Sequence, residues 1–403
     1  MQVSPDKVLE RGTVVFRHGR IVAVGRDVEV PAEAQVWDLT DKTVYAGFID
    51  AYNEQPVEVP VKLGGTPYWN DRVRPQLEVS EHLTIDKERN AALRSQGIIA
   101  QLVAPTGAVI DGGCAVVSTA DDPVNRTILK DHGPRHLRLT VKRNHTRDQY
   151  PSSPMGAVAL ARQAMYDAQW YKTAWAEYKA NDELPRPERN DALAALEPCL
   201  AGELPVLLDA PNEWYFLRAH RFADEFNLKA AMVGSGREYR RLDEIAATGR
   251  TVIVPLSFSQ PPSVASPAAA LNTSLASLMH WDIAPENPAR LAQAGVPIAF
   301  TAHGLKEIKD FLPRLRQAVE RGLSREKALA ALTTNAAVLC SASDQLGTIE
   351  PGRLASLIVT DGDIFDKKTK IERVWVEGKP HLTDPGPSIN VRGTWIAKLT
   401  PPG

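Results

Sequence analysis

The sequence predicts a mixed α/β fold with a largely parallel sheet and a smaller β module beside it. Through the middle of the chain, short apolar runs alternate with longer amphipathic stretches, the pattern of repeated strand and helix units. The two ends carry short strands with alternating polarity instead. The chain has 403 residues, of which 43% are hydrophobic and 24% charged. This length is large for one compact domain, so we expect one large and one smaller domain.

Charge and composition exclude several classes of function. The formal net charge is −2, so the chain lacks the excess of positive charge that is typical of proteins that bind nucleic acid or an anionic membrane. No apolar run approaches the roughly 18 residues of a membrane span, and the first residues do not form a signal peptide. These features favour a cytoplasmic protein, with export left open if an upstream segment has been removed. Cys114, Cys199 and Cys340 are widely spaced, so buried free thiols are expected.

The N-terminal region predicts a β-hairpin. Residues 12–25 read as two short alternating strands joined at His18-Gly19, and further strand material is expected at residues 35–39 and 43–45. Near the other end, residues 346–363 and 371–380 have the same strand-like pattern.

The central region contains the alternating strands and helices. Strands are predicted at residues 44–50, 97–104, 136–142, 204–209, 228–233, 251–256 and 296–301, with an eighth either at 115–118 or near 277–281. Helices are predicted at residues 156–178, 214–226, 238–247, 305–321 and 324–337. The last helix opens at Ser324, a residue type that caps helix N-termini. The Pro- and Ser-rich segment 255–267 follows a predicted strand and is expected to be a loop, either a lid or a surface excursion.

The chain is organised around the run Gly47-Phe-Ile-Asp-Ala-Tyr-Asn-Glu54. Tyr52 and Glu54 are two residues apart on a predicted strand, so their side chains leave the same face. This run resembles the P-G-F-I-D-x-H-x-H signature of the amidohydrolase superfamily of metal-dependent hydrolases, in its imidazolonepropionase- and dihydroorotase-like branches. Residues 12–45 and 346–380 are similar to the opening and closing segments of the same superfamily.

The resemblance implies a (β/α)8 TIM-like barrel with a composite β-sandwich built from both chain ends. On this basis we expect a sandwich from residues 1–45 together with 344–384 and a barrel from 46–343. Residues 385–403 are expected to form a linker or the start of a further module.

The resemblance also implies a site, and this sequence departs from it. Members of the superfamily hold zinc or another divalent metal with histidines, a bridging Lys or Glu, and a final Asp that takes a proton from metal-bound water. The matching ligand positions are occupied by Tyr52, Glu54, Asp209 and His303; Ser235 or Gly236 stands near another, and Arg138 and Arg143 stand at the bridging positions. No cofactor is therefore predicted.

Two functions follow from these substitutions. The resemblance implies hydrolysis of non-peptide carbon–nitrogen bonds in cyclic amide-like substrates. The replaced ligands favour a catalytically degenerate domain, a pseudoenzyme that supports a neighbouring domain or a homo-oligomer. The alternative is an active hydrolase of a small-molecule substrate, with a rebuilt metal or acid/base site made by Glu54, Asp209 and His303, in which His303 and Asp209 would be catalytic.

The basic segment at residues 135–147 has two interpretations as well. Arg138 and Lys142 would replace the charge of the metal beside Glu54 and Asp209 if they point inward. Otherwise the segment is a solvated strand end and loop.

Overall fold

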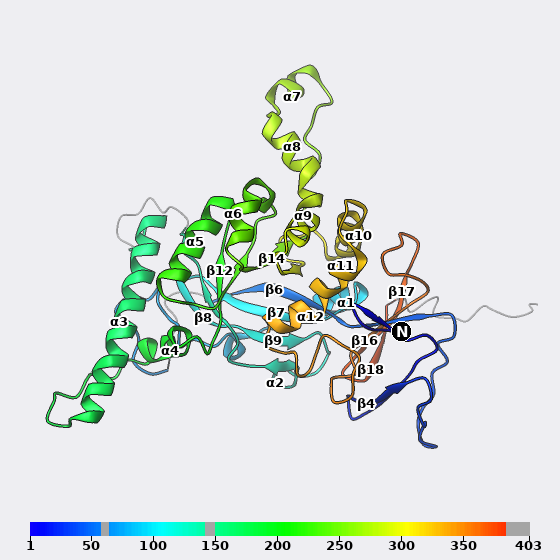
Figure 1. Ribbon diagram of the computed structural model, residues 1–403, viewed down its shortest axis with the longest axis horizontal. Helices are drawn as coiled ribbons and strands as arrows, with labels where there is room; N and C mark the ends of the chain where they lie inside the picture. Colours follow the sequence, from blue (N-terminus) through cyan, green and yellow to red (C-terminus); the bar gives the residue numbers. More distant parts are fainter. Residues whose placement is uncertain (58–63, 142–149, 384–403) are drawn as a thin grey trace, which may run out of the picture.

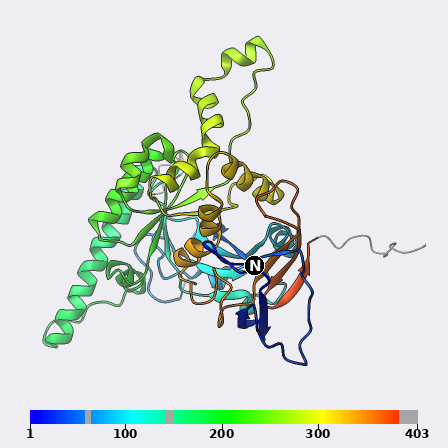
Figure 2. The same ribbon diagram turned by 45° about the vertical axis from the view of Figure 1, so that its right-hand side comes forward.

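The computed structural model describes residues 1–57, 64–141 and 150–383, and the structural statements below refer to these residues. The long helix α3 (Pro154–Ala180) flanks one side of a central body of strands, and a β-rich region that contains the N-terminus forms the opposite side (Figure 1). The helices α7 (Pro267–Asn272) and α8 (Leu275–Ile283) project away from this body (Figures 1 and 2).

The other elements follow the chain in order. The strands are β1 (Gln2–Ser4), β2 (Lys7–Val8), β3 (Thr13–Arg17), β4 (Arg20–Gly25), β5 (Thr43–Ala46), β6 (Phe48–Pro56), β7 (Ile98–Thr106), β8 (Ile110–Gly113), β9 (Ala115–Ser118), β10 (Ile128–Lys130), β11 (Arg135–Leu137), β12 (Val206–Asp209), β13 (Ala230–Val233), β14 (Thr251–Pro255), β15 (Ile298–Thr301), β16 (Leu357–Thr360), β17 (Ile371–Val376) and β18 (Lys379–Leu382). The remaining α-helices are α1 (Lys87–Ser95), α2 (Val124–Thr127), α4 (Asp191–Leu200), α5 (Glu213–Glu225), α6 (Leu242–Ala247), α9 (Asn287–Gln293), α10 (Phe311–Glu320), α11 (Arg325–Leu332) and α12 (Thr334–Leu339). Short 3₁₀ helices lie at η1 (Val79–His82), η2 (Glu238–Arg241), η3 (Ala284–Glu286) and η4 (Ile308–Asp310).

The central strands form two hydrogen-bonded sheets. One has the order β10-β9-β7-β6, and the other has the order β15-β14-β13-β12-β11-β8. The strands from β11 to β15 run parallel, as do β6 and β7, whereas β8 and β9 run antiparallel to their neighbours. Parallel strands covered on both faces are expected to be apolar throughout, and β7 is buried along its whole length. The predicted α/β class is confirmed.

Side-chain contacts join these two sheets. The Thr301 hydroxyl, at the end of β15, donates a hydrogen bond of 2.5 Å to the carbonyl of Tyr52 in β6. The Ala302 amide donates to the Asp50 carboxylate at 3.2 Å. On the other side, the ring of His136 in β11 lies 2.9 Å from the carbonyl of Pro105 in β7. Side-chain hydrogen bonds therefore join β6 to β15 and β7 to β11.

Strands from both chain ends share one sheet, with the order β18-β17-β16-β5-β1-β2. Strand β16 lies between β5 and β17, so a C-terminal strand completes the pairing of an N-terminal one. Apolar side chains from both ends form a separate small core: Val3, Ile21, Val44, Ala46, Ile349, Ala355, Leu357, Val359 and Trp375. The β3–β4 hairpin turns at His18-Gly19, as the sequence predicted.

Gly19 allows this hairpin to pack closely against the C-terminal strands. It has φ of +77°, and a Cβ at this position would lie 2.8 Å from the carbonyl oxygen of Glu377. Gly295 has φ of +78°, with nothing within 4 Å of its Cβ position. Both Gly→Ala changes should cost about 1 kcal/mol for the left-handed backbone. We expect Gly19→Ala to lower the free energy of unfolding by a further ~1–2 kcal/mol, measured by urea denaturation. Equal losses in the two variants would contradict this close approach.

Three predicted elements need correction. The expected strand at 44–50 is divided at Gly47 into β5 and β6, which belong to different sheets; a Cβ on Gly47 would lie 2.3 Å from Ile99. Residues 277–281 lie in helix α8, which Ser274 caps, because a short apolar run does not distinguish a strand from a helix. Residues 35–39 form no strand.

Other features agree with the sequence. Ser324 caps α11 by accepting a hydrogen bond from the Lys327 amide. The three cysteines are free and buried, as expected. In the described part of the chain, every helix is too short or too polar to cross a membrane. The predicted linker at 385–403 lies outside the described residues.

Candidate functional site

The predicted site residues lie at the carboxyl ends of central strands. Glu54 is near the end of β6, Asp209 is the last residue of β12, Arg138 directly follows β11, and His303 follows β15 by two residues. In parallel α/β folds, side chains at these strand ends converge on a common edge, where ligands bind. The structure brings Glu54, Asp209 and Arg138 into direct contact and leaves His303 at their margin.

The Arg138 guanidinium joins the two carboxylates. Its Nη2 donates to Glu54 Oε1 at 2.8 Å, and its Nε donates to Asp209 Oδ2 at 2.5 Å. The side chains are largely buried, with exposed fractions of 28% for Arg138, 26% for Glu54 and 13% for Asp209. Arg138 therefore points toward the two carboxylates, which is the first of the two interpretations that the sequence left open for this residue. Lys142 and Arg143, which the sequence placed beside it, lie outside the described residues.

His136 is a fully buried member of the same group. Its Nε2 lies 2.9 Å from Asp209 Oδ1, and its Nδ1 lies 2.9 Å from the Pro105 carbonyl and 3.4 Å from Asp111 Oδ2. Carbonyl and carboxylate oxygens only accept hydrogen bonds, so each ring nitrogen needs a proton. Burial opposes this charge, but Asp209 and Asp111 outweigh it and raise the pKa of His136 to about 10.

The sequence interpretation missed this role of His136, although a signal was present. His136 and Arg138 are two residues apart, so the strand alternation that turns Arg138 inward also turns His136 inward. His136 lies in the basic segment 135–147, and the charge of that segment alone does not indicate a separate role for the ring.

Arg138 and His136 together keep Asp209 ionised. Burial opposes the charge on Asp209, but His136 and then Arg138 hold its pKa below its usual range. Behind the ring, the Arg74 guanidinium pairs with Asp111 at 3.1 Å, with both side chains buried. The six groups form a continuous chain of ion pairs: Glu54, Arg138, Asp209, His136, Asp111 and Arg74. Three carboxylates face three cations, so the group is electrically balanced.

Tyr52 closes the inner side of this group. Its hydroxyl donates to Glu54 Oε1 at 2.9 Å and lies 3.3 Å from His136 Nε2. Burial, then the nearby Asp209 and Glu54, raise the pKa of Tyr52 well above its usual range. The hydroxyl is therefore a hydrogen-bond donor at neutral pH.

His303 lies at the outer margin. Its ring meets the edge of Tyr52 with centroids 5.4 Å apart, and its Nε2 is 3.7 Å from Glu54 Oε1. The side chain is 41% exposed. It is more solvent-accessible than Tyr52, Glu54, Arg138 and Asp209.

These residues do not fit a divalent metal. The ligand atoms of Glu54, Asp209 and His303 do not all lie within 4.8 Å of one another. Arg138 already occupies the space between the two carboxylates, and a doubly protonated His136 has no lone pair to offer. A cation placed there would need to displace the guanidinium.

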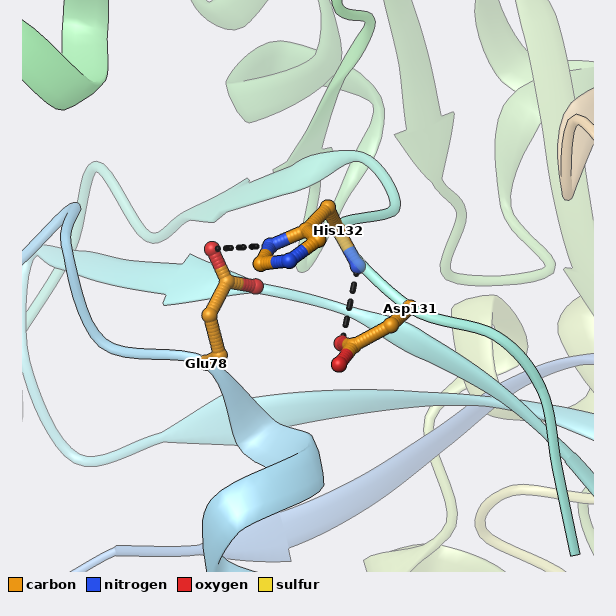
Figure 3. A group of neighbouring side chains, drawn as sticks. All are labelled: Glu78, Asp131 and His132. Atoms are coloured by element: carbon orange, nitrogen blue, oxygen red, sulfur yellow. Dashed lines mark hydrogen bonds and ion pairs between the residues drawn. The ribbon is translucent and has the colours of Figure 1, made fainter. Parts of the chain in front are cut away.

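In the described part of the chain, one group of three side chains does meet the distance requirement for shared metal coordination: Glu78, Asp131 and His132. In Figure 3, His132 Nδ1 faces Glu78 Oε1 at 3.1 Å, and the His132 amide donates to Asp131 at 2.8 Å. Glu78 Oε1 is also paired with Arg135 at 2.7 Å, so its charge is already compensated. Arg135 begins β11, so this group lies at the opposite end of that strand from Arg138.

Asp50, within the run 47–54, and Ser235 have local structural partners. Asp50 is fully buried, and burial raises the pKa of its carboxyl to about 6 against the hydrogen bonds that it accepts. The Ser235 amide donates to Glu238 at 2.7 Å, which closes the turn after β13.

The family comparison matches one end of the chain. Residues 316–381 match the model of the amidohydrolase family, which covers α11, α12 and the strands β16 and β17. No curated protein matches the chain.

Solved structures resemble the whole chain. An amidohydrolase from Thermotoga maritima MSB8 is 23% identical, with a TM-score of 0.72 over 91% of this chain and 94% of that one. A prolidase in complex with N-methylphosphonate-L-proline is 18% identical, with a TM-score of 0.53 over 93% and 95%. A molinate hydrolase is 14% identical, with a TM-score of 0.52 over 98% and 97%. These likenesses establish a shared fold.

Proposed function

We propose that this chain, a member of the amidohydrolase superfamily, is a catalytically degenerate domain in which the Arg138 guanidinium takes the place of the catalytic metal. The observation that carries the proposal is the bridge from Arg138 to Glu54 and Asp209. The resemblance to the superfamily suggests hydrolysis of carbon–nitrogen bonds as the activity that this domain lacks.

The chemical argument concerns water activation. In metal-dependent hydrolases the metal lowers the pKa of a bound water, and a nearby base takes its proton. A guanidinium neutralises the same carboxylates but has only N–H donors and no open coordination position. Asp209 is held ionised by two cations and accepts hydrogen bonds from both, which leaves it a poor base. The site therefore retains the charge balance of a metal centre without its reactivity.

We expect the purified protein to contain no stoichiometric zinc, manganese or iron, and to leave dihydropyrimidine, hydantoin and imidazolone substrates intact. Elemental analysis after purification without chelators and a hydrolysis assay measure these two results. About one metal per chain, lost in Glu54→Ala and retained in the surface control Glu244→Ala, would contradict the proposal. Turnover that requires His303 would instead support the rebuilt acid/base site of Glu54, Asp209 and His303.

We also propose that the two central sheets belong to one (β/α)8 barrel spanning residues 46–343, closed between β6 and β15. Support comes from the Thr301–Tyr52 and Ala302–Asp50 hydrogen bonds across that junction. The sheet shared by both chain ends supports a composite sandwich from residues 1–45 and 344–384. In this arrangement the domain would serve a partner, either a neighbouring domain or a second copy, through its surface.

A further inference from the structure

Strand β6 carries a buried carboxyl group that the Arg138 site does not use. Asp50 is fully buried, and its Oδ1 accepts hydrogen bonds from the Tyr52 amide at 3.3 Å and from the Ala302 amide at 3.2 Å. Its other oxygen, Oδ2, is buried and has no hydrogen-bond partner among the described residues. A buried carboxylate oxygen without a donor is costly, so Oδ2 requires a partner.

A second buried oxygen without a donor belongs to the neighbouring strand. Gln101 is the register partner of Asp50 in the parallel pair of β6 and β7. Side chains at paired positions of adjacent strands leave the same face of the sheet, and the strands lie about 5 Å apart. Gln101 is 5% exposed, and its Oε1 is likewise buried without a partner in the described part of the chain. Two adjacent side chains therefore each present an acceptor that lacks a donor.

The elements packed around Asp50 do not neutralise it by contact, within the residues that the structure describes. Strands β7 and β15 and helix α12 contain no charged residue, and the buried residues of α11 are alanines and leucines. Cys340, which follows α12, is fully buried, and burial raises the pKa of its thiol, so it is uncharged at neutral pH. Arg89 on α1 favours the charged form of Asp50, but its guanidinium donates to Asn53 Oδ1 at 3.0 Å. A proton is the smallest group that can neutralise this carboxylate.

We propose that Asp50 holds a proton on Oδ2 and donates it in a hydrogen bond to Gln101 Oε1, which makes the junction of β15, β6 and β7 sensitive to pH. One proton then gives both oxygens a partner. Asp50 also joins the three strands, because its Oδ1 still accepts from the amides of Tyr52 and Ala302. Ionisation removes the donor to Gln101 and leaves a buried charge, so the junction weakens as the pH rises.

The pH range of this effect follows from the surroundings of the carboxyl group. Burial raises the pKa of Asp50 from its usual value of 3.8 to about 6, against the hydrogen bonds that it accepts. Because the folded pKa lies above the unfolded value, the contribution of the proton to stability is fully present below pH 3.8 and is lost as the pH rises to about 6. This inference does not depend on the Arg138 site, because metal content and hydrolysis are measured separately from this pH profile.

The first test compares the wild type with Asp50→Asn, which mimics the protonated form because its amide donates and its oxygen accepts. Urea denaturation between pH 4.5 and 7 gives the ratio of the two folding equilibrium constants, in which the titration of other groups cancels. With pKa values of about 6 folded and 3.8 unfolded, the ratio of wild type to variant should fall roughly 25-fold over this range. Asp344→Asn, at an exposed side chain, is the matched control, and its ratio should stay constant. A constant ratio for Asp50→Asn would overturn the proposal.

Infrared spectroscopy detects the proton itself. The wild type at pH 5 should show the C=O band of a buried protonated carboxyl group that is lost at pH 7.5 and absent from Asp50→Asn. Gln101→Leu should shift this band, because the carboxyl group loses its acceptor. The wild-type and Gln101→Leu spectra decide the question even if Asp50→Asn does not fold. A Gln101 amide with its nitrogen toward Asp50, or a water that donates to both oxygens, would keep Asp50 ionised; the missing band would overturn the proposal, as would a band that Gln101→Leu leaves unchanged.

Discussion

Replacing Arg138 with methionine is expected to lower the free energy of unfolding by about 2–4 kcal/mol at pH 7. The substitution keeps the apolar stem but leaves Glu54 and Asp209 largely buried with one cation fewer. Removing one partner of a fully buried ion pair typically costs about 3–5 kcal/mol, and the partial exposure of these side chains reduces that figure. Urea denaturation at low and high salt measures the loss.

Removing the carboxylates should restore the stability of this variant. In Arg138→Met/Glu54→Gln/Asp209→Asn the unpaired charges are gone, so we expect at least half of the lost free energy to return. Arg17→Met is the matched control, because Arg17 pairs with Glu33 at an exposed site; its cost should stay below about 1 kcal/mol. If Arg138→Met cost no more than this control, the two carboxylates would not depend on the guanidinium.

The sequence predicted those features that depend on local pattern. Alternation of polar and apolar residues identified the hairpin at His18-Gly19, and a strand followed by polar residues placed Glu54 and Asp209 at one edge. The same alternation predicted that Arg138 could point toward them. These features follow from spacing along the chain, which the sequence displays directly.

The rest depends on contacts between distant segments. Gly47 divides β5 from β6 because Ile99 occupies the space that a side chain would need, a contact visible only once the strands are assembled. His136 becomes a cation because the Pro105 carbonyl, Asp111 and Asp209 surround it. Residues 277–281 are helical and lie in α8, which Ser274 caps and which projects from the body (Figure 1).

The positive charge on buried His136 predicts how the free energy of unfolding depends on pH. His136 has a pKa of about 10 in the folded protein, against about 6.5 in an unfolded chain. Its contribution is fully present below pH 6.5 and is lost as the pH rises toward 10, because only the folded state keeps the proton in this range. We expect the free energy of unfolding to fall by about 1.3 kcal/mol per pH unit, or about 2 kcal/mol from pH 7 to 8.5.

This window separates His136 from the other shifted side chains. Burial also lowers the pKa of the Met1 α-amino group from its usual value near 8, which makes stability rise with pH in this range, and this contribution is the same in the wild type and in a His136 variant. His280 and His381 have lowered pKa values and titrate below about 6.5, and burial raises the pKa of the thiols Cys114, Cys199 and Cys340, whose linkage begins only above about pH 8.5. His136→Gln should therefore be less stable at pH 7 and should show no fall in the free energy of unfolding from pH 7 to 8.5. Urea denaturation at three pH values in this range tests both results. A wild-type profile as flat as that of the variant would mean that His136 is neutral, and Asp209 would then have Arg138 as its one cationic partner among the described residues.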